Sequence, residues 1–473
     1  MALGKGLCHQ LDSYVAEEYL SFHTPGHKGR LDFLRGIKFP AFDLTELPGL
    51  DMLHTPRGVI AEAQLRASMV FGSEETYFLV NGGTSGNQAM FMSLEHYSGK
   101  KVLVERKSHR SVMSALVLTG LDPEYIEPVI HPEFNLALGT DVENFTLANQ
   151  KVIACHLTYP SYYGTVINLE AVIQERDKIS SNTVILVDQA HGSHYINDLF
   201  PVSSIRLGAD LVLNSTHKTL GSLTQSAMLH VQGNLVNRTK LRQSLEIIQS
   251  SSPSYLLMAS LELATESALL YRRWHELYEE VEQLHHDLGN KIRILSKQDA
   301  GCYGISELDW SKILINTASL GIPAGICVEY LRQNYKIEPE MWDDDNILFM
   351  LGIGNTAEDV KLLSQSLQKL LDSAKFMRDK PLRNKNNHFS LPKVPKRLTP
   401  RDAFFSGKRQ VQVRDSIGLI AAETISPYPP GIPLIVMGEE ITAEVREYLL
   451  AAGNDSWQGW DGKKDGSIWV VDS

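Results

Sequence analysis

The sequence predicts an α/β protein with a largely parallel sheet in its main domain, followed by a smaller α/β unit. Short apolar runs alternate with longer amphipathic runs over residues 77–230, which is typical of repeated β–α units. Residues 312–373 then have the pattern of strand, helix, strand and helix. A polar, proline-containing stretch at 375–401 separates both units from a C-terminal segment of different composition.

The expected strands of the main domain carry Val, Ile and Leu at consecutive positions, as a sheet covered on both faces requires. These strands are expected at 77–80, 101–105, 152–157, 183–188, 211–213 and 227–231. The helices between them are expected at 87–96, 111–119 and 169–178. Residues 255–295 are helical in pattern almost throughout, so we expect them to bridge to the second unit.

These patterns divide the chain into five parts. We expect an N-terminal arm at 1–54, a large domain at 55–300, a small α/β domain at 301–374, a linker at 375–400 and a C-terminal α+β domain at 401–473. The YPPGIP segment at 428–433 is expected to be neither regular helix nor central strand, because its prolines fix φ and remove hydrogen-bond donors.

Composition and charge narrow the class of protein. The 473 residues include 56 Asp and Glu against 45 Lys and Arg, a surplus that disfavours nucleic acid and anionic membranes as partners. The four cysteines are widely spaced, so we expect reduced thiols and no metal cluster. The sequence shows neither a leader pattern nor a run of about 18 apolar residues. We therefore expect a cytoplasmic protein without a membrane segment.

Lys218 is the sharpest chemical signal in the sequence. It lies in Ser215-Thr216-His217-Lys218-Thr219, directly after the apolar run 211–213. Desolvation at the end of a buried strand lowers the pKa of a lysine, so that its neutral amine can attack a carbonyl. Taken alone, a lysine that follows a strand is more often a solvated loop residue.

Two further segments make a catalytic role for Lys218 more credible. Asp188 ends another apolar strand and could hold a protonated pyridine nitrogen, although it could also cap the next turn. The glycine-rich segment 81–87 follows a strand and opens a helix, as a phosphate cradle does. The alternative is an ordinary glycine-rich turn with an N-cap. The segment matches neither the nucleotide P-loop motif G-x-x-x-x-G-K-[ST] nor the dinucleotide-binding motif G-x-G-x-x-G.

A phosphate cradle, a strand-end Asp and a strand-end Ser-x-His-Lys follow one another as in fold-type I enzymes of pyridoxal 5′-phosphate (PLP). The sequence resembles the ornithine/lysine/arginine decarboxylase family over nearly its whole length. The motifs that carry this resemblance lie at 22–29 (FHTPGHKG), 43–53 (DLTELPGLDML), 81–87, 109–111, 188–191, 215–220 (STHKTL), 252–255 (SPSY) and 428–433. The length is similar to that of the compact group that lacks an N-terminal wing domain.

The resemblance implies a fold and a set of cofactor contacts. The fold is that of aspartate aminotransferase-like enzymes, with a mostly parallel, seven-stranded type of sheet. Lys218 would bond covalently to PLP, Asp188 would pair with its pyridine nitrogen, and His109 would stack on its ring. The remaining expected cofactor contacts are Gly83, Thr84, Ser85, His191, Ser215, His217 and, reaching a neighbouring subunit's phosphate, Ser250. Two positions depart from the family, since Gln189 replaces a usual Glu and Met437 a usual Pro.

The activity that the resemblance implies is decarboxylation of a basic L-amino acid, with arginine ahead of lysine and ornithine. Glu423 and Glu439 flank the YPPGIP segment and are candidates for binding the cationic side chain, although both could be solvated carboxylates. The strand at 346–354 carries no arginine to clamp a carboxylate, which disfavours an aminotransferase. An aldolase or a non-catalytic regulatory homologue remains an alternative. We expect a homodimer or larger homo-oligomer with shared active sites.

Overall fold

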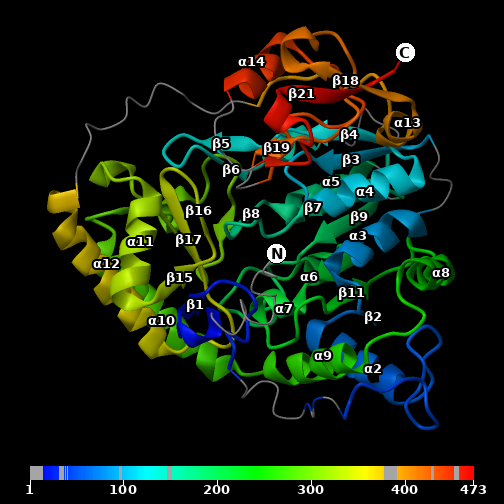
Figure 1. The fold of residues 1–473 in the computed structure, drawn as a ribbon. Coiled ribbons are helices and arrows are strands. Elements are labelled where there is room, and N and C mark those ends of the chain that lie inside the picture. The colour runs from blue at the N-terminus through cyan, green and yellow to red at the C-terminus, as the bar shows by residue number, and fades with distance from the viewer. Residues whose placement is uncertain are drawn as a thin grey trace, which may run out of the picture.

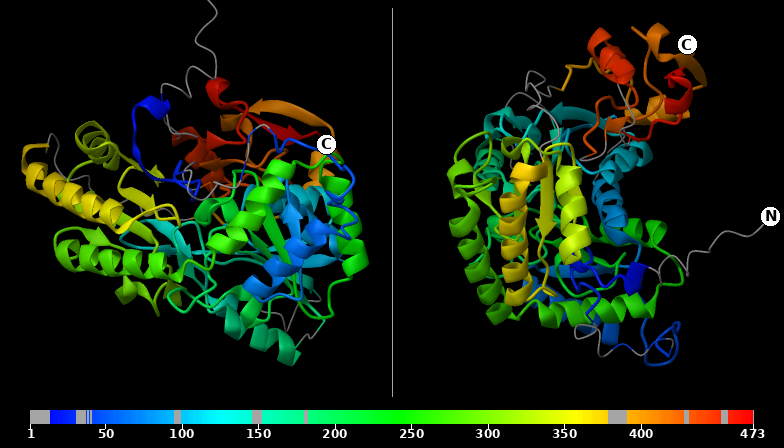
Figure 2. Two further views of the ribbon diagram at one scale, coloured as in Figure 1. Left: turned by 90° about the horizontal axis from the view of Figure 1, so that it is seen from below. Right: turned by 60° about the vertical axis from the view of Figure 1, so that its left-hand side comes forward.

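The computed structural model describes residues 14–30, 37, 39, 41–94, 99–145, 152–179, 182–377, 391–427, 431–451 and 457–472. Figure 1 shows three units, with the large domain on the right, the small domain on the left and the C-terminal domain above them. Figure 2 shows from two further sides that the C-terminal domain lies against the large domain. The mixed α/β class and the central sheet confirm the expected fold class.

The large domain is built on a seven-stranded sheet. β11 (Ala227–Val231) is antiparallel to its neighbours, and the other strands run parallel to one another. The strand order is β2 (Glu75–Leu79), β11, β10 (Leu211–Asn214), β9 (Val184–Asp188), β7 (Val152–Thr158), β3 (Lys101–Glu105) and β4 (Asp122–Ile126). The pattern analysis missed β4, because this edge strand has the sequence DPEYI and carries both charge and proline.

Helices cover both faces of this sheet (Figure 1). One face packs against α3 (Gly82–Ser93), α4 (Arg110–Thr119) and α8 (Arg238–Ile248). The other packs against α2 (Val59–Phe71), α5 (Leu169–Ile179), α6 (Ser204–Leu207) and α9 (Tyr255–Ser267). α3 starts earlier than residue 87, because the glycine-rich segment is itself the first turn of the helix. This position brings the helix N-terminus to the end of the sheet.

The small domain contains a four-stranded antiparallel sheet. Its strand order is β12 (Arg293–Ile294), β14 (Lys312–Asn316), β17 (Asn346–Met350) and β16 (Met341–Trp342). Its helices are α10 (Tyr271–Leu288), α11 (Ala324–Tyr335) and α12 (Ala357–Met377). The helical prediction for 255–295 was therefore wrong at its end, where β12 forms, and this sheet begins before residue 301.

Three short pairings tie the domains together. β1 (Leu20–Phe22) in the N-terminal arm pairs in parallel with β15 (Ile337–Pro339) of the small domain. β8 (Thr165–Val166) pairs with β13 (Glu307–Leu308). The hairpin of β5 (Val129–His131) and β6 (Leu136–Gly139) adds Phe134 and Leu136 to an apolar cluster with Leu314 and Leu348. The arm and the large domain thus close around one edge of the small domain.

The C-terminal domain has its own apolar core, in which Val413, Ile435, Val445 and Ile468 are buried. Its elements are α13 (Pro400–Phe405), β18 (Lys408–Gln412), β19 (Ser426–Pro427), α14 (Ala443–Ala451), β20 (Trp457–Gln458) and β21 (Ser467–Val471). This is the expected α+β composition. Part of the YPPGIP segment, 428–430, lies outside the described residues, and 431–433 form neither helix nor strand.

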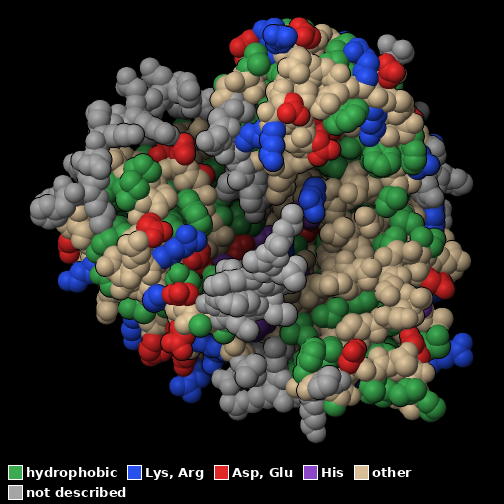
Figure 3. Space-filling model, viewed as in Figure 1, with side chains coloured by type: hydrophobic (Ala, Val, Ile, Leu, Met, Phe, Trp, Pro, Cys, Tyr) green, Lys and Arg blue, Asp and Glu red, His purple; other side chains and the backbone are tan. Residues whose placement is uncertain are grey.

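Charged and apolar side chains alternate over much of the face in Figure 3, but apolar groups gather over α9 and α2 at its lower right. On α2, Val59, Leu65 and Met69 are all more than half exposed. In the described part of the chain, no helix is both long and apolar enough to cross a lipid bilayer.

A buried ion pair connects the C-terminal domain to the large domain. Arg106, just after β3, binds both carboxylate oxygens of Glu439, at 2.7 and 2.9 Å, and both side chains are almost fully buried. The guanidinium also donates to the carbonyl oxygens of Pro433 and Leu434 at 3.3 Å. The end of the YPPGIP segment is therefore held on the large domain by Arg106.

We expect Arg106→Met to lower the free energy of unfolding by about 3–5 kcal/mol, because Glu439 would remain as a buried charge without its partner. Arg397→Met is the matched control, since it removes a cation from the exposed pair with Glu440 at 2.7 Å. That loss should be about 1 kcal/mol or less. Denaturant unfolding with limited proteolysis of the C-terminal domain measures both changes. If both variants lost the same free energy of unfolding, burial would not make the Arg106–Glu439 pair more important to stability than the exposed pair.

Candidate active site

The carboxyl ends of β9 and β10 bring the main predicted site residues together. Asp188 is the last residue of β9, and Lys218 lies on α7 (Thr216–Thr219), a short turn directly after β10. The two strands are parallel neighbours, so their ends meet at one edge of the sheet. Nζ of Lys218 lies 2.8 Å from Nε2 of His191, which follows β9.

The surroundings of Lys218 favour a neutral amine. Desolvation lowers the pKa of Lys218, and the positive charge of Lys312 acts in the same direction, while Asp188 and Glu340 oppose it. Burial also lowers the pKa of His191 well below its usual value, with the charge of Lys218 next in importance. A neutral His191 imidazole can accept a hydrogen bond from the Lys218 amine. This pair therefore holds a nucleophilic nitrogen in the crevice.

Asp188 is held by two donors. Nδ2 of Asn87 donates to one carboxylate oxygen at 2.8 Å, and the backbone amide of Ala190 donates to the other at 3.0 Å. Asp188 itself is only 4% exposed. The carboxylate is therefore fixed at the strand end, where it can face a cationic ring nitrogen.

Asn87 also connects Asp188 to residues that the sequence analysis did not identify. Its Nδ2 donates to Oγ of Ser111 at 2.9 Å, and its Oδ1 lies 3.4 Å from Nε2 of the buried His156. Burial lowers the pKa of His156 to about 4. The available signal for Asn87 was its place one helical turn after Gly83, which puts it beside the strand ends.

His109 precedes α4 and joins the same network. Its Nδ1 lies 2.8 Å from Oγ of Ser111 and accepts from the Ser111 backbone amide at 3.3 Å, so it caps the helix. Partial burial lowers the pKa of His109, and the charge of Asp188 opposes this shift. His109 therefore caps α4 and lies near the site, while ring stacking remains a prediction.

The first turn of α3 fits closely against the Lys218 turn. A Cβ at Gly83 would lie 2.6 Å from Oγ of Ser215, and one at Gly86 would lie 2.4 Å from Cδ1 of Leu213. Only glycine allows this approach, which places the helix N-terminus beside Ser215. Thr84 is exposed there, and Oγ of Ser85 donates to the Gly82 carbonyl at 2.8 Å. Nδ1 of His217 lies 2.8 Å from the Ser226 carbonyl, and burial lowers the pKa of His217 to about 4.

The N-terminal motif packs over the Lys218 turn. The Gly26 amide donates to the His217 carbonyl at 2.7 Å, and the Gly354 amide of the small domain donates to the Gly26 carbonyl at 2.9 Å. A Cβ at Gly26 would lie 2.5 Å from the Leu220 carbonyl oxygen. Lys28 donates to the carbonyl of Met350 at 2.9 Å, and burial lowers the pKa of Lys28 to about 7. The motif therefore locks the arm, the small domain and the site together.

Three other expectations have different outcomes. Arg106 binds both oxygens of Glu439 in a buried pair, so the substrate role expected for Glu439 stays a prediction that this geometry does not support. Glu423 accepts from the Trp469 amide at 3.0 Å within the C-terminal domain, and its role in substrate binding stays a prediction. Gln189 is buried, where its Oε1 accepts from both the amide and the hydroxyl of Ser204. This departure from the family is thus accommodated locally.

Ser250 lies on the surface near the start of α3. Its backbone amide lies 3.4 Å from Oδ1 of Asn81, and its carbonyl accepts from Nε2 of His54 at 2.9 Å. Its hydroxyl forms hydrogen bonds with the backbone of Ser252. Whether it reaches a second subunit stays a prediction.

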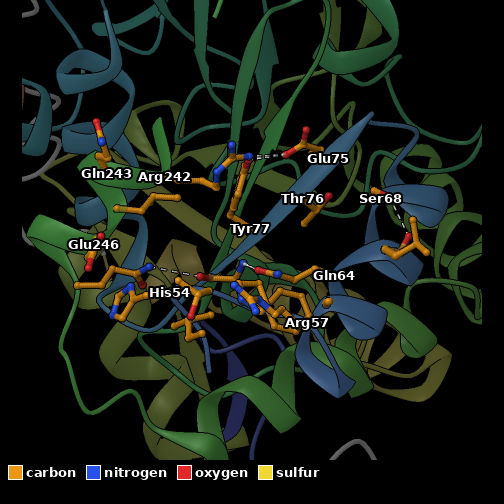
Figure 4. A pocket seen from close by; sticks show the side chains of 18 of the residues that line it. His54, Arg57, Gln64, Ser68, Glu75, Thr76, Tyr77, Arg242, Gln243 and Glu246 are labelled. Atoms are coloured by element: carbon orange, nitrogen blue, oxygen red, sulfur yellow. Dashed lines mark hydrogen bonds and ion pairs between the residues drawn. The ribbon is translucent and has the colours of Figure 1, made fainter. Parts of the chain in front are cut away.

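A surface cavity of about 550 Å³ lies between α2, β2 and α8 (Figure 4). In its wall Arg242 lies 3.8 Å from Glu75, and the Tyr77 hydroxyl donates to Glu75. None of the predicted cofactor residues lines this cavity, so it is separate from the Lys218 site. It adjoins the Ser250 segment through His54.

Comparison with known proteins identifies the relatives of this chain. Residues 6–300 match the family model of the Orn/Lys/Arg decarboxylase major domain, and 386–459 match that of the C-terminal domain. The chain belongs to the Orn/Lys/Arg decarboxylase family. It is 34% identical to the arginine decarboxylase of Bacillus anthracis over 91% of this chain and 89% of that protein. The arginine decarboxylase of Bacillus subtilis is 31% identical over 93% of this chain and 92% of its own length.

Solved structures support the same fold. The lysine decarboxylase of Francisella novicida superposes with a TM-score of 0.77 and 20% identity, covering 99% of this chain and 84% of that one. Serine palmitoyltransferase of Sphingomonas wittichii superposes at 0.56 over 76% of this chain and 88% of its own. These superpositions show the fold, and the Orn/Lys/Arg decarboxylase family implies PLP as the cofactor.

The residues present fit that cofactor. Lys218 offers an amine, Asp188 a fixed carboxylate for a ring nitrogen, and the first turn of α3 a glycine-lined helix end for a phosphate. Nδ1 of His191 and Oγ1 of Thr219 are buried without a hydrogen-bond partner within the described ranges. Unsatisfied polar atoms at such a place are consistent with a polar ligand site.

We expect Asn87→Ala to reduce kcat about tenfold or more, because Asp188 loses a charge-assisted hydrogen bond. Asn334→Ala is the matched control, since Asn334 is exposed on α11 and donates to the Tyr330 carbonyl. Its kcat should stay within twofold of wild type. Turnover is measured at saturating PLP, with bound cofactor determined by absorbance. Unchanged turnover in Asn87→Ala would show that Asp188 does not need this donor.

Proposed function

We propose that this family member decarboxylates L-arginine to agmatine and CO2. The observation that carries a PLP-dependent reaction is the amine of Lys218, 2.8 Å from a neutral His191 at the strand ends that also hold Asp188. Arginine is favoured over lysine and ornithine, because the Bacillus relatives at 31–34% identity are arginine decarboxylases. The lysine decarboxylase of Pseudomonas aeruginosa is 25% identical.

The chemistry is divided between the cofactor and this chain. PLP bound here supplies an electron sink for the charge left when CO2 departs. Lys218 would attach it, and the first turn of α3, with Gly83, Thr84 and Ser85, would hold its phosphate together with Ser215 and His217. Asp188 would keep the ring nitrogen protonated, and His109 would lie against the ring.

The protein surroundings control the protons at Lys218. Burial disfavours the ammonium form, and His191 can accept the hydrogen bond that orients the amine. Gly26 packs against the backbone of Thr219 and Leu220 on the arm side of this turn. β17 carries no arginine, which supports decarboxylation over transamination.

Purified protein with PLP should release agmatine from arginine, and less cadaverine or putrescine from lysine or ornithine. Lys218→Ala should lose this activity by several orders of magnitude, because the nucleophilic amine is gone. Amine products are identified by chromatography, and borohydride reduction should label a peptide that contains Lys218. Cadaverine or putrescine as the main product would correct the substrate, and a label on a different lysine would overturn the site.

We also propose a homodimer with shared active sites. Ser250 is exposed beside the start of α3, and its partner His54 lines the same cavity as α2, whose Val59, Leu65 and Met69 are exposed. An apolar surface of this kind is typical of an interface. A partner placed here could extend its own Ser250 toward the phosphate site.

Mixing Lys218→Ala subunits with Ser250→Asp subunits tests this arrangement. We expect each homodimer to be nearly inactive, because one lacks the amine and the other places a negative charge near the phosphate. A heterodimer should regain up to about half of wild-type activity per dimer, since one of its two sites is intact. Heterodimers are verified by differential tags. No recovery in verified heterodimers would indicate self-contained subunits.

A further inference from the structure

Glu340 lies where the arm, the large domain and the small domain meet. It follows β15 and precedes β16, and its backbone amide donates to the Leu348 carbonyl at 2.9 Å, so its backbone belongs to the sheet. Oε2 accepts from the Thr24 amide at 2.7 Å, and Oε1 accepts from the Tyr162 hydroxyl at 3.0 Å. The carboxylate therefore has a fixed position.

A continuous path of contacts leads from Lys218 to this carboxylate. His191, which lies 2.8 Å from Nζ of Lys218, packs edge-to-face against the ring of Tyr162, with centroids 5.1 Å apart. Tyr162 then donates to Glu340. The negative charge of Glu340 is close enough to raise the pKa of Lys218, against the lowering effect of burial. Glu340 thus ends a series of contacts that starts at Lys218 and passes through His191 and Tyr162.

The carboxylate retains capacity for a cation. A carboxylate accepts about four hydrogen bonds, and the two that the described part of the chain supplies come from a hydroxyl and a backbone amide, both neutral. The nearby Lys28 directs its ammonium to the carbonyl oxygens of His23 and Met350 instead. Glu340 is also partly exposed, in contrast to Glu439.

We infer that Glu340 binds the cationic end of the substrate side chain, with its carboxylate accepting the planar N–H groups of a guanidinium. This assignment rests on the proposed function and replaces Glu439 as the residue that selects a basic amino acid. Of the other acids near this site, Asp188 is the residue proposed for the ring nitrogen, and Asp309 is paired with Lys312. A planar, two-point contact with a carboxylate is a geometry that guanidinium groups favour. In Figure 3, acidic and histidine side chains are visible in the hollow between the small and large domains.

Glu340→Gln tests this role, because the amide oxygen can still accept from Thr24 while the negative charge is removed. We expect kcat/KM for arginine to fall about 10- to 100-fold, mainly through KM, as for loss of a charge-assisted hydrogen bond. Citrulline has nearly the same shape and an uncharged end. The preference for arginine over citrulline should therefore narrow by a similar factor.

A second measurement avoids turnover. Agmatine, tested as a competitive inhibitor and by calorimetry with the PLP-loaded enzyme, should bind Glu340→Gln about 10- to 100-fold more weakly than wild type. The matched control is Glu338→Gln, two residues earlier, where the carboxylate is bound to Arg332. This control should keep wild-type discrimination and agmatine affinity.

The outcomes separate this inference from the proposed function. Suppose that wild type decarboxylates a basic amino acid, but Glu340→Gln lowers kcat/KM for arginine and for citrulline by the same factor. Glu340 then only positions the arm, and the inference is wrong. Unchanged agmatine affinity would overturn it equally. If wild type acts on none of the basic amino acids, the proposed function fails first.

Discussion

The arrangement of the site depends on keeping a lysine amine out of water at the end of a buried strand. Burial disfavours the charged form of Lys218, and the polar partner His191 gives the neutral amine a fixed direction. Parallel strands make this possible, because their carboxyl ends open on one crevice while helices cover both faces. The glycines of α3 then allow a helix N-terminus to approach the same point.

Buried polar groups around this amine require partners, and a network of side chains supplies them. Asp188, Asn87 and Ser111 form hydrogen bonds of 2.8 and 2.9 Å from β9 through α3 to α4, and His109 continues the series. Such groups cost free energy unless they are paired. The network therefore fixes the relative positions of a strand and two helices while it orients the carboxylate.

Segments far apart in the sequence complete the crevice. Gly26 of the arm lies against Thr219 and Leu220 on one side and Gly352 on the other, an approach that leaves no room for a Cβ. The ion pair between Arg106 and Glu439 holds the C-terminal domain on the large domain. The substrate path from Lys218 to Glu340 therefore has walls from the arm, the large domain and the small domain.

The sequence by itself determined the features that are local. Apolar runs predicted every strand of the large sheet except β4, and the residues at or just after the ends of β2, β9 and β10 pointed to the cradle, Asp188 and Lys218. The family resemblance supplied the cofactor and the reaction class. These features are readable because strand periodicity and the chemistry of strand-end residues depend on a few neighbouring positions.

Only the tertiary structure decided which side chains meet across long separations. Glu439 and Glu340 have the same side-chain chemistry, but folding placed Glu439 against Arg106 in a buried pair and left Glu340 partly exposed beside Tyr162. Asn87 likewise shows its role only when α3 packs beside β9. The difference is physical, because an acidic residue is available to a cationic ligand only where folding leaves its oxygens without a cation.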